Sequence, residues 1–260
     1  MSQNDIWGGF IIMLWGSFGA VHIISLILAV GMNVAVYFIL KNKSVKTQLI
    51  TLGIYSLWGI AAVVFDMFMW NSPIEYLPLH LCSISAVVLP FAVFTRSKII
   101  NNLLLLWSLG AVAALVVNTQ QANFEIFSGT FLFYYMPHVV ELGIPVIMFK
   151  LGLVKKDARC IFSTLGITFV AYTIIHFINL GLNALIVANN MLDWKGDLIQ
   201  VNYMYSLSSP GNPVLDLLYN ILPHSYWYML LLFPIMLIYL CFVYLPEIIR
   251  MFKAKRTKEQ

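Results

Sequence analysis

Residues 12–39 read IMLWGSFGAVHIISLILAVGMNVAVYFI, a stretch without a single Lys, Arg, Asp or Glu. The basic sequence KNKSVK follows almost at once, at positions 41–46. A helix of about 20 apolar residues crosses the roughly 30 Å hydrocarbon core of a bilayer. Basic residues beside such a helix are typical of its cytoplasmic end. The stretch therefore predicts a transmembrane helix that ends in the cytoplasm.

The composition of the whole chain indicates the same environment. Of its 260 residues, 61% are hydrophobic and only 10% are charged, and the mean hydropathy is +0.86. Soluble domains have about 45–50% apolar and about 25% charged residues, so a water-soluble globule is excluded. The net charge of +4 comes from basic residues in short loops beside apolar segments, so no nucleic-acid partner is expected.

Seven apolar stretches are long enough to cross a bilayer, and no soluble domain fits between them. We therefore expect an all-α, polytopic membrane bundle with seven transmembrane helices in one integral membrane domain over residues 1–260. The longest connection, about 188–224, has a Pro/Gly/Ser-rich centre and helically spaced apolar residues from Val214 to Leu222, which predict a short interfacial helix. The predicted spans are about 12–39, 48–70, 78–95, 99–118, 130–150, 160–187 and 225–248.

The basic residues predict the orientation of these spans. Fourteen of the fifteen Lys and Arg residues fall on one side, and Lys195 alone lies opposite. Because basic loops stay in the cytoplasm, the N-terminus is expected outside and the C-terminus inside. The first residues, MSQNDIWGG, lack the basic segment of a cleavable signal peptide, so none is expected.

Ionisable side chains within the spans gather at one depth. Such groups are costly in lipid and are functional-site candidates by default. With the predicted orientation, all of them fall in the outer half of the membrane, which indicates a functional site there. They are His22, Asp66, His80, Cys82, His138, Glu141 and His176, with His224 at the mouth of the last span.

Helix geometry predicts some of the pairings within this group. His138 and Glu141 are three residues apart and share a helix face, and a carboxylate on one imidazole nitrogen raises the basicity of the other. Cys82 follows Pro78 by four residues, so its thiol is expected near a helix N-terminus, which favours the thiolate. A second stripe on one face consists of His176, Asn179 and Asn183.

The three cysteines form no spaced pair, so neither a disulfide framework nor a zinc site is predicted. Cys160 and Cys241 lie away from the outer group and are interpreted as packing residues. Tyr134 and Tyr135 are interpreted as part of an aromatic belt or core, and the loop TQQANFEIF (119–127) as a solvated loop.

Three segments carry a resemblance to a known family. They are YLPLHLCSISAVVLPFAVF (76–94), FGAVHIISLIL (18–28) and VNYMYSLSSPGNPVLDLLYNILPHSYWYML (201–230). The first resembles the LPLHLC-type signature of the YwaF-like bacterial integral membrane proteins, and the third resembles their NYLF-type segment and closing P-WYI. That family is similar to eukaryotic transmembrane protein 164, a lipid acyltransferase proposed to use a Cys and a His. The resemblance implies a multi-pass protein of the bacterial plasma membrane.

The resemblance also implies a chemistry: acyl transfer through a thioester, without a cofactor or metal. Cys82 would be the nucleophile, and His138, oriented by Glu141, would take its proton. A membrane phospholipid would donate the acyl chain, and a second lipid or a lipoprotein would accept it. His80, Asn118 and Asn202 are candidate oxyanion donors. The expected substrate-binding residues are His22, Asp66, His80, Asn118, His176 and Asn202.

Two other classes of function stay open at this point. A transporter or solute-binding protein would use the same outer residues, although the inner halves of the spans lack ionisable groups and no inverted repeat is evident. A metal-dependent membrane hydrolase would need ligands from several spans, because no HExxH or H-x-E spacing occurs on one helix. Its candidate ligands are Asp66 with His22, His80, His138, His176 or His224. No particular oligomeric state is predicted.

Overall fold

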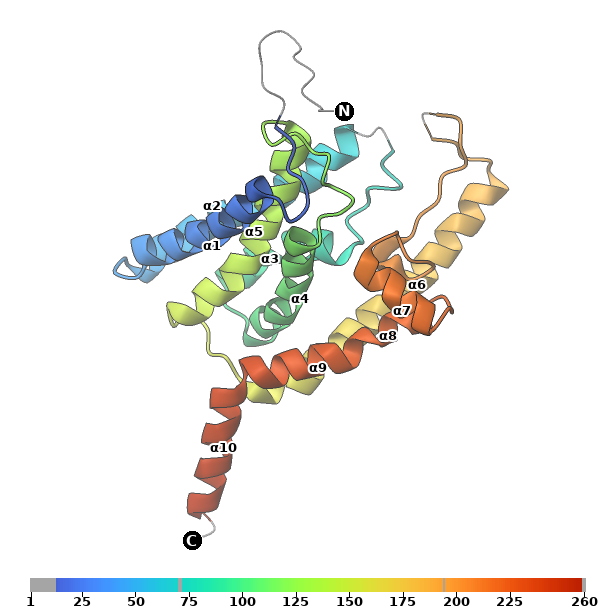
Figure 1. Cartoon of the computed structure of the whole chain (residues 1–260). Helices are drawn as coiled ribbons and strands as arrows, with labels where there is room; N and C mark the ends of the chain where they lie inside the picture. The colour runs from blue at the N-terminus through green and yellow to red at the C-terminus, as the bar shows by residue number, and fades with distance from the viewer. Residues whose placement is uncertain (1–12, 70–71, 194, 259–260) are drawn as a thin grey trace.

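A computed structural model of the chain describes residues 13–69, 72–193 and 195–258 (Figure 1). Within these residues the fold is all-helical, as predicted, with two isolated β-bridges and no longer strand. The expectation about a signal peptide concerns residues outside the described part. The helices are α1 (Ala20–Leu40), α2 (Val45–Met69), α3 (Leu81–Thr95), α4 (Lys98–Val116), α5 (Gly129–Lys150), α6 (Ile161–Ala188), α7 (Pro213–Ile221), α8 (Trp227–Leu230), α9 (Leu232–Val243) and α10 (Leu245–Lys258), with single 3₁₀ turns at Ala158–Cys160 and Tyr203–Tyr205.

Five helical segments among the described residues are long and apolar enough to cross a membrane: α1, α2, α4, α5 and Ala158–Ala188. They become six if the segments Trp227–Val243 and Leu245–Ala254, which are bent by 65° at their junction, count as one span. The third predicted span is the shorter helix α3, which has 15 residues. The count of seven spans and the orientation of the termini stay predictions.

The first helix begins later than the sequence predicts, at Ala20 rather than near residue 12. Gly16 and Phe18 have positive φ angles of 70° and 56°, which an α-helix does not accommodate. The backbone N–H of Trp15 donates to the carbonyl of Phe124 at 2.8 Å. The segment before α1 therefore pairs with the loop between α4 and α5 instead of extending the helix.

The third predicted span also begins later, because α3 starts at Leu81 with His80 as its N-cap. The N–H of Leu79 donates to the carbonyl of Leu77 at 2.6 Å, a tight turn that a helix starting at Pro78 would not contain. Pro78 therefore precedes the helix instead of occupying its first position. Cys82 becomes the second residue of α3.

The last predicted span is broken into α8, α9 and α10, and the sharp bend falls at Tyr244. Pro246 has no backbone N–H for the carbonyl of Phe242, and its ring crowds the preceding turn. α9 and α10 therefore cannot continue as one straight helix, and α10 leaves the body of the molecule (Figure 1).

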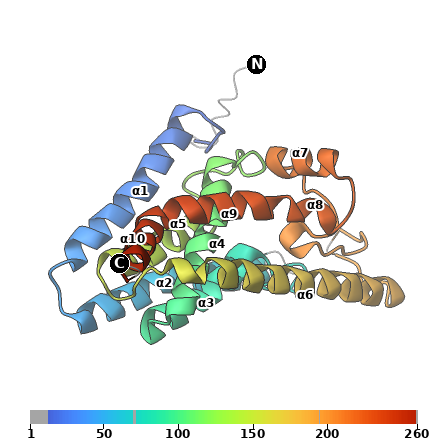
Figure 2. The ribbon, with the colours of Figure 1, turned by 90° about the horizontal axis from the view of Figure 1, so that it is seen from below.

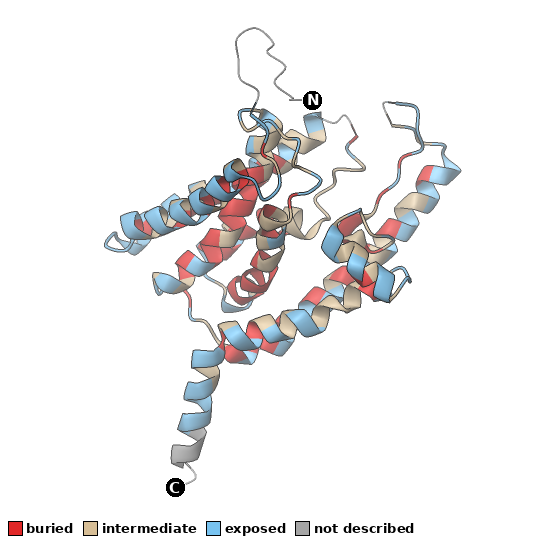
Figure 3. Ribbon diagram, in the orientation of Figure 1, coloured by how far each residue is buried: buried red, intermediate tan, exposed pale blue. Residues whose placement is uncertain are grey.

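The helices form two groups. α1 to α5 lie together, and α6 lies beside α9 on the other side of the molecule (Figures 1 and 2). Buried residues concentrate on α4 and α5 (Figure 3), and Leu104 and Ile144 on these helices belong to the largest core cluster together with Leu89 of α3. Large apolar side chains on the outer helices are exposed, for example Ile27 on α1 and Phe177 on α6. This outward apolar surface suits a lipid environment.

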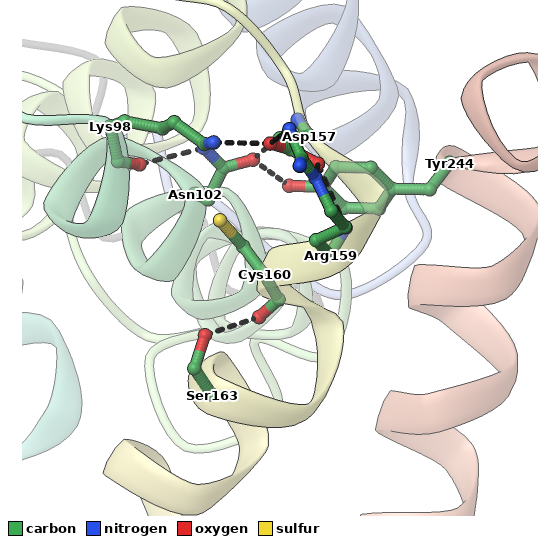
Figure 4. Close-up of polar contacts among 7 residues, drawn as sticks. All are labelled: Lys98, Asn102, Asp157, Arg159, Cys160, Ser163 and Tyr244. Carbon is green, nitrogen blue, oxygen red and sulfur yellow. Dashed lines mark hydrogen bonds and ion pairs between the residues drawn. The ribbon is translucent and has the colours of Figure 1, made fainter. Parts of the chain in front are cut away.

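A polar cluster joins the start of α4, the loop before α6 and the end of α9 (Figure 4). The Asp157 carboxylate pairs with Arg159 at 3.1 Å and with Lys98, and the Tyr244 hydroxyl donates to Asn102 Oδ1. The Arg159 guanidinium and the Lys98 ammonium hold the pKa of the Asp157 carboxyl group well below its usual range. The cluster lies at the end of the bundle that the basic residues predict to be cytoplasmic.

Candidate functional site

Three of the predicted site residues meet where α3 begins and α5 passes. One ligand atom each from Cys82, His138 and Glu141 lie within 4.8 Å of one another. His138 and Glu141 are buried and Cys82 is half-buried. Cys82 and His138 are 56 positions apart in the sequence and lie on different helices. The fold thus brings them into one cluster.

The geometry of α5 orients the histidine. His138 Nδ1 lies 2.6 Å from the backbone carbonyl oxygen of Tyr134, one turn earlier. A carbonyl oxygen only accepts hydrogen bonds, so Nδ1 carries the proton and donates, and Nε2 is left as the acceptor. A histidine held in this tautomer is ready to take a proton at Nε2.

Glu141 lies beside both other members of the cluster. Its carboxyl group lies within 4.8 Å of the Cys82 thiol. The hydrogen bond that orients His138 comes from the Tyr134 carbonyl. Glu141 is thus close to both groups, since all three lie within the same 4.8 Å.

Two cavities open onto the cluster. One of about 260 Å³ lies among α2, α3, α5 and the 118–128 loop, and Cys82, His138 and Glu141 all line it. A wider one of about 480 Å³ extends towards α4, α6 and α9 and is also lined by Cys82 and His138. Cys82 and His138 therefore border both cavities.

Two further predicted residues lie beside this space. Asp66, near the end of α2, lines both cavities. His80 lines the wider cavity, and its Nδ1 accepts a hydrogen bond of 3.3 Å from the Met204 N–H. Both side chains therefore border a cavity that Cys82 also lines.

His22 and Asn118 make hydrogen bonds to the backbone that stabilise the fold. His22 Nδ1 accepts from the Phe18 N–H and Nε2–H donates to the Leu115 carbonyl, each at 2.8 Å. The Asn118 amide donates to the Gly16 carbonyl at 2.6 Å. Both side chains are completely buried, and neither lines the two cavities. They hold the segment before α1 against the end of α4.

His176 and Asn202 also lie outside the two cavities. His176 Nδ1 pairs with Ser206 Oγ at 3.1 Å, and the Asn202 amide donates to the Ser208 carbonyl at 2.8 Å. The polar stripe on α6 thus binds the long loop after it, which Asn179 and Asn183 contact as well. Of the other cysteines, Cys160 is buried beside the polar cluster of Figure 4 and Cys241 is exposed on α9.

Tyr134, Tyr76 and Gln121 line both cavities but are not among the residues predicted for the site. Tyr134 precedes His138 by four residues and Glu141 by seven, so the three share one helix face. That spacing is a signal in the sequence that could have placed Tyr134 in the site. Nothing comparable marks Tyr76 or Gln121, which belong to loops.

The fold and the cluster define a helical, polytopic membrane protein with a Cys/His/Glu site inside its bundle. The chain belongs to the TMEM164 family, whose model matches residues 17–244. This match confirms the family resemblance of the sequence and covers all three members of the cluster. Comparisons with curated proteins and with solved structures found no match.

Proposed function

We propose that the protein is a membrane-embedded acyltransferase of the outer leaflet of the plasma membrane. It moves a fatty acyl chain between lipids, or onto a lipid-anchored acceptor, through a thioester on Cys82. The observation that carries this proposal is the approach of Cys82, His138 and Glu141 to within 4.8 Å beside the two cavities. A thiol next to an oriented imidazole is the arrangement that activates a cysteine nucleophile.

In the first half-reaction, His138 Nε2 takes the thiol proton and Cys82 Sγ attacks the carbonyl carbon of a lipid ester. The C–O bond to the glycerol oxygen breaks, and that oxygen leaves with the proton from the imidazolium as a lysolipid hydroxyl. While the imidazolium exists, the Glu141 carboxylate stabilises its positive charge. The products are an acyl thioester on Cys82 and a neutral His138.

The second half-reaction reverses these roles. A hydroxyl or amine of the acceptor gives its proton to His138 Nε2 and attacks the thioester carbonyl, and the C–S bond breaks. Cys82 regains its proton, so the enzyme is unchanged and needs no cofactor.

The oxyanion of each tetrahedral intermediate needs hydrogen-bond donors. The first N–H groups of a helix have no intrahelical partner and carry the positive end of its dipole. Cys82 and Ser83 occupy the first turn of α3 and supply two such groups. They are better placed than Asn118 or Asn202, whose side chains are engaged elsewhere.

The test is acyl exchange between two phospholipids in vesicles containing the purified protein. Cys82→Ser is expected to slow exchange by about two orders of magnitude or more, because a hydroxyl is a far weaker nucleophile than a thiol. Mass spectrometry should find a fatty-acyl adduct on Cys82 in the parent protein. Cys241→Ser, on the exposed side of α9, is the matched control and should keep both the rate and the adduct. Undiminished exchange by folded Cys82→Ser would refute the thioester.

One observation favours a second candidate, metal-dependent ester hydrolysis. Among the described residues, Cys82, His138 and Glu141 form a set that could hold a metal ion. Three protein ligands of these types with an open position are typical of catalytic zinc. Stoichiometric zinc in the purified protein, together with loss of lipid hydrolysis on chelation, would favour this function. Exchange that persists in a chelator, with an adduct on Cys82, would favour acyl transfer.

A further inference from the structure

The wider cavity extends past Cys82, away from the smaller one. One wall is α4, from Leu106 to Ala114, and the opposite wall is α9, from Leu232 to Met236. Cys82 lies where the two cavities meet, since it lines both. A molecule that reacts at the thiol therefore has room on the α4–α9 side.

The walls of this extension are apolar. Every lining residue contributed by α4 and α9 is hydrophobic or glycine. The nearby polar groups of α6 and α4 are paired within the protein: Trp107 Nε1–H donates to Thr168 Oγ1 at 3.0 Å, and Tyr172 O–H donates to the Tyr226 carbonyl at 2.7 Å. A polar solute would have few hydrogen-bond partners there, and burying it would cost free energy. A hydrocarbon chain has no hydrogen bonds to lose on entering.

Gly110 keeps the passage between the thiol and this extension open. A Cβ atom at this position would lie 3.3 Å from Leu81 Cδ2 and 4.0 Å from Cys82 Sγ. Any larger side chain on Gly110 would therefore occupy the space directly beside the sulfur. Ala113, one turn further along α4, is also small and lines the same cavity.

We propose that the acyl chain of the reacting lipid lies in this extension, between α4 and α9, with its ester carbonyl at Cys82. The length of the chains that fit is then determined by Gly110, Ala113 and Met236. The proposal rests on the proposed acyl transfer for its substrate class. We infer an acyl chain as the occupant because the extension is continuous with the thiol and has apolar walls. The whole wider cavity, of which the extension is one part, has about 480 Å³, within the roughly 300–1,000 Å³ of ligand pockets.

The experiment uses two phosphatidylcholines in vesicles, one with a diazirine near the methyl end of an acyl chain and one with it near the ester. Crosslinking is done in the full-length Cys82→Ser protein, so that binding is measured without turnover. The methyl-end probe is expected to label peptides of α9 around 232–236 and of α4 around 106–109. The ester-end probe is expected to label residues near 110 and 134–138.

Two variants narrow the cavity from opposite walls: Ala113→Phe on α4 and Met236→Trp on α9. Either should abolish labelling of the opposite wall by the methyl-end probe. When each variant is made in the protein that keeps Cys82, acyl exchange should shift towards shorter chains. Ala35→Phe, at an exposed position of α1, is the matched control and should change neither readout. Retained solubility and an unchanged elution profile identify the folded variants.

The outcomes separate the two proposals. Labelling of both walls without any exchange or adduct would support the chain site and reject acyl transfer. Exchange with labelling confined to the outer surface of α1 or α6 would reject the chain site alone. The chain site would also be rejected if the walls were labelled equally in the parent and in both narrowing variants. The probe would then not lie between Ala113 and Met236.

Discussion

At the scale of single residues, two buried histidines use their ring nitrogens differently. Both nitrogens of His22 are hydrogen-bonded to the backbone, to the Phe18 N–H and the Leu115 carbonyl. His138 uses Nδ1 for the Tyr134 carbonyl, which leaves Nε2 as the nitrogen that can accept a proton. A histidine whose two nitrogens are both paired within the fold stabilises the structure, whereas one with an available nitrogen can transfer a proton.

This difference predicts opposite effects of substitution. His138→Gln should lower acyl exchange by about 10²–10⁴-fold, the range for loss of a general base, and leave stability nearly unchanged. His22→Ala should lower the free energy of unfolding by about 1–3 kcal/mol for each backbone group left unpaired, with exchange per folded molecule preserved. Thermal unfolding in detergent and exchange rates measure the two effects. If both variants lost exchange equally per folded molecule, the assignment of His138 to proton transfer and of His22 to structural stabilisation would be wrong.

At the scale of helices, α2 and α3 lie close together at Gly59. A Cβ there would lie 2.7 Å from Ala86 Cβ and 2.9 Å from its Cα, so the two backbones would have to move apart. Gly59→Ala should therefore cost about 1–3 kcal/mol of stability and also slow exchange, because α3 carries Cys82. Gly166→Ala on α6 is the control: nothing lies within 4 Å, and stability should rise by up to about 1 kcal/mol. If Gly59→Ala changed neither the stability nor the exchange rate, this close packing of α2 and α3 would be contradicted.

The junction of α4 and α6 predicts a pH dependence. Arg159 and Lys98 lower the pKa of the Asp157 carboxyl group from its ordinary value of 3.8. The unfolded chain takes up a proton near that value while the native carboxylate stays ionised. The stabilisation is therefore complete above about pH 5 and is lost as the pH falls below about 4.

Asp157→Asn removes this contribution. Its melting temperature should lie below that of the parent at neutral pH, and the difference should shrink as the pH falls below about 4. Melting curves measured across the pH range check this expectation, with the exposed Asp197→Asn as a control that shows no such gap. A difference that stays constant down to about pH 3 would contradict the role of the ion pairs.

At the scale of the whole molecule, the distribution of basic residues predicts the topology. A reporter fused after Gln260 should lie in the cytoplasm, and one inserted in the 119–129 loop should lie outside. Labelling with an impermeant reagent distinguishes the two sides. Both reporters on one side would overturn the orientation and, with it, the placement of the Cys82 site in the outer leaflet.

Composition and the spacing of residues along the chain are enough to predict the class of the protein and much of its local structure. A long apolar run predicts a membrane helix wherever it occurs, since the backbone must satisfy its own hydrogen bonds in lipid. The position of Cys82 at a helix start and the shared face of His138 and Glu141 follow from short spacings along single helices. These features depend on neighbours in the chain, so local patterns suffice to predict them.

Which of these polar residues contact one another depends on how the helices pack. The sequence predicts depth along the membrane normal, but it does not predict the rotation of each helix or which helices are neighbours. Depth alone therefore groups His22 and His176 with Cys82, although their ring nitrogens contact Leu115 and Ser206 instead. The later start of α1 and the break at Tyr244 likewise depend on distant partners and on backbone geometry, which hydropathy alone does not encode.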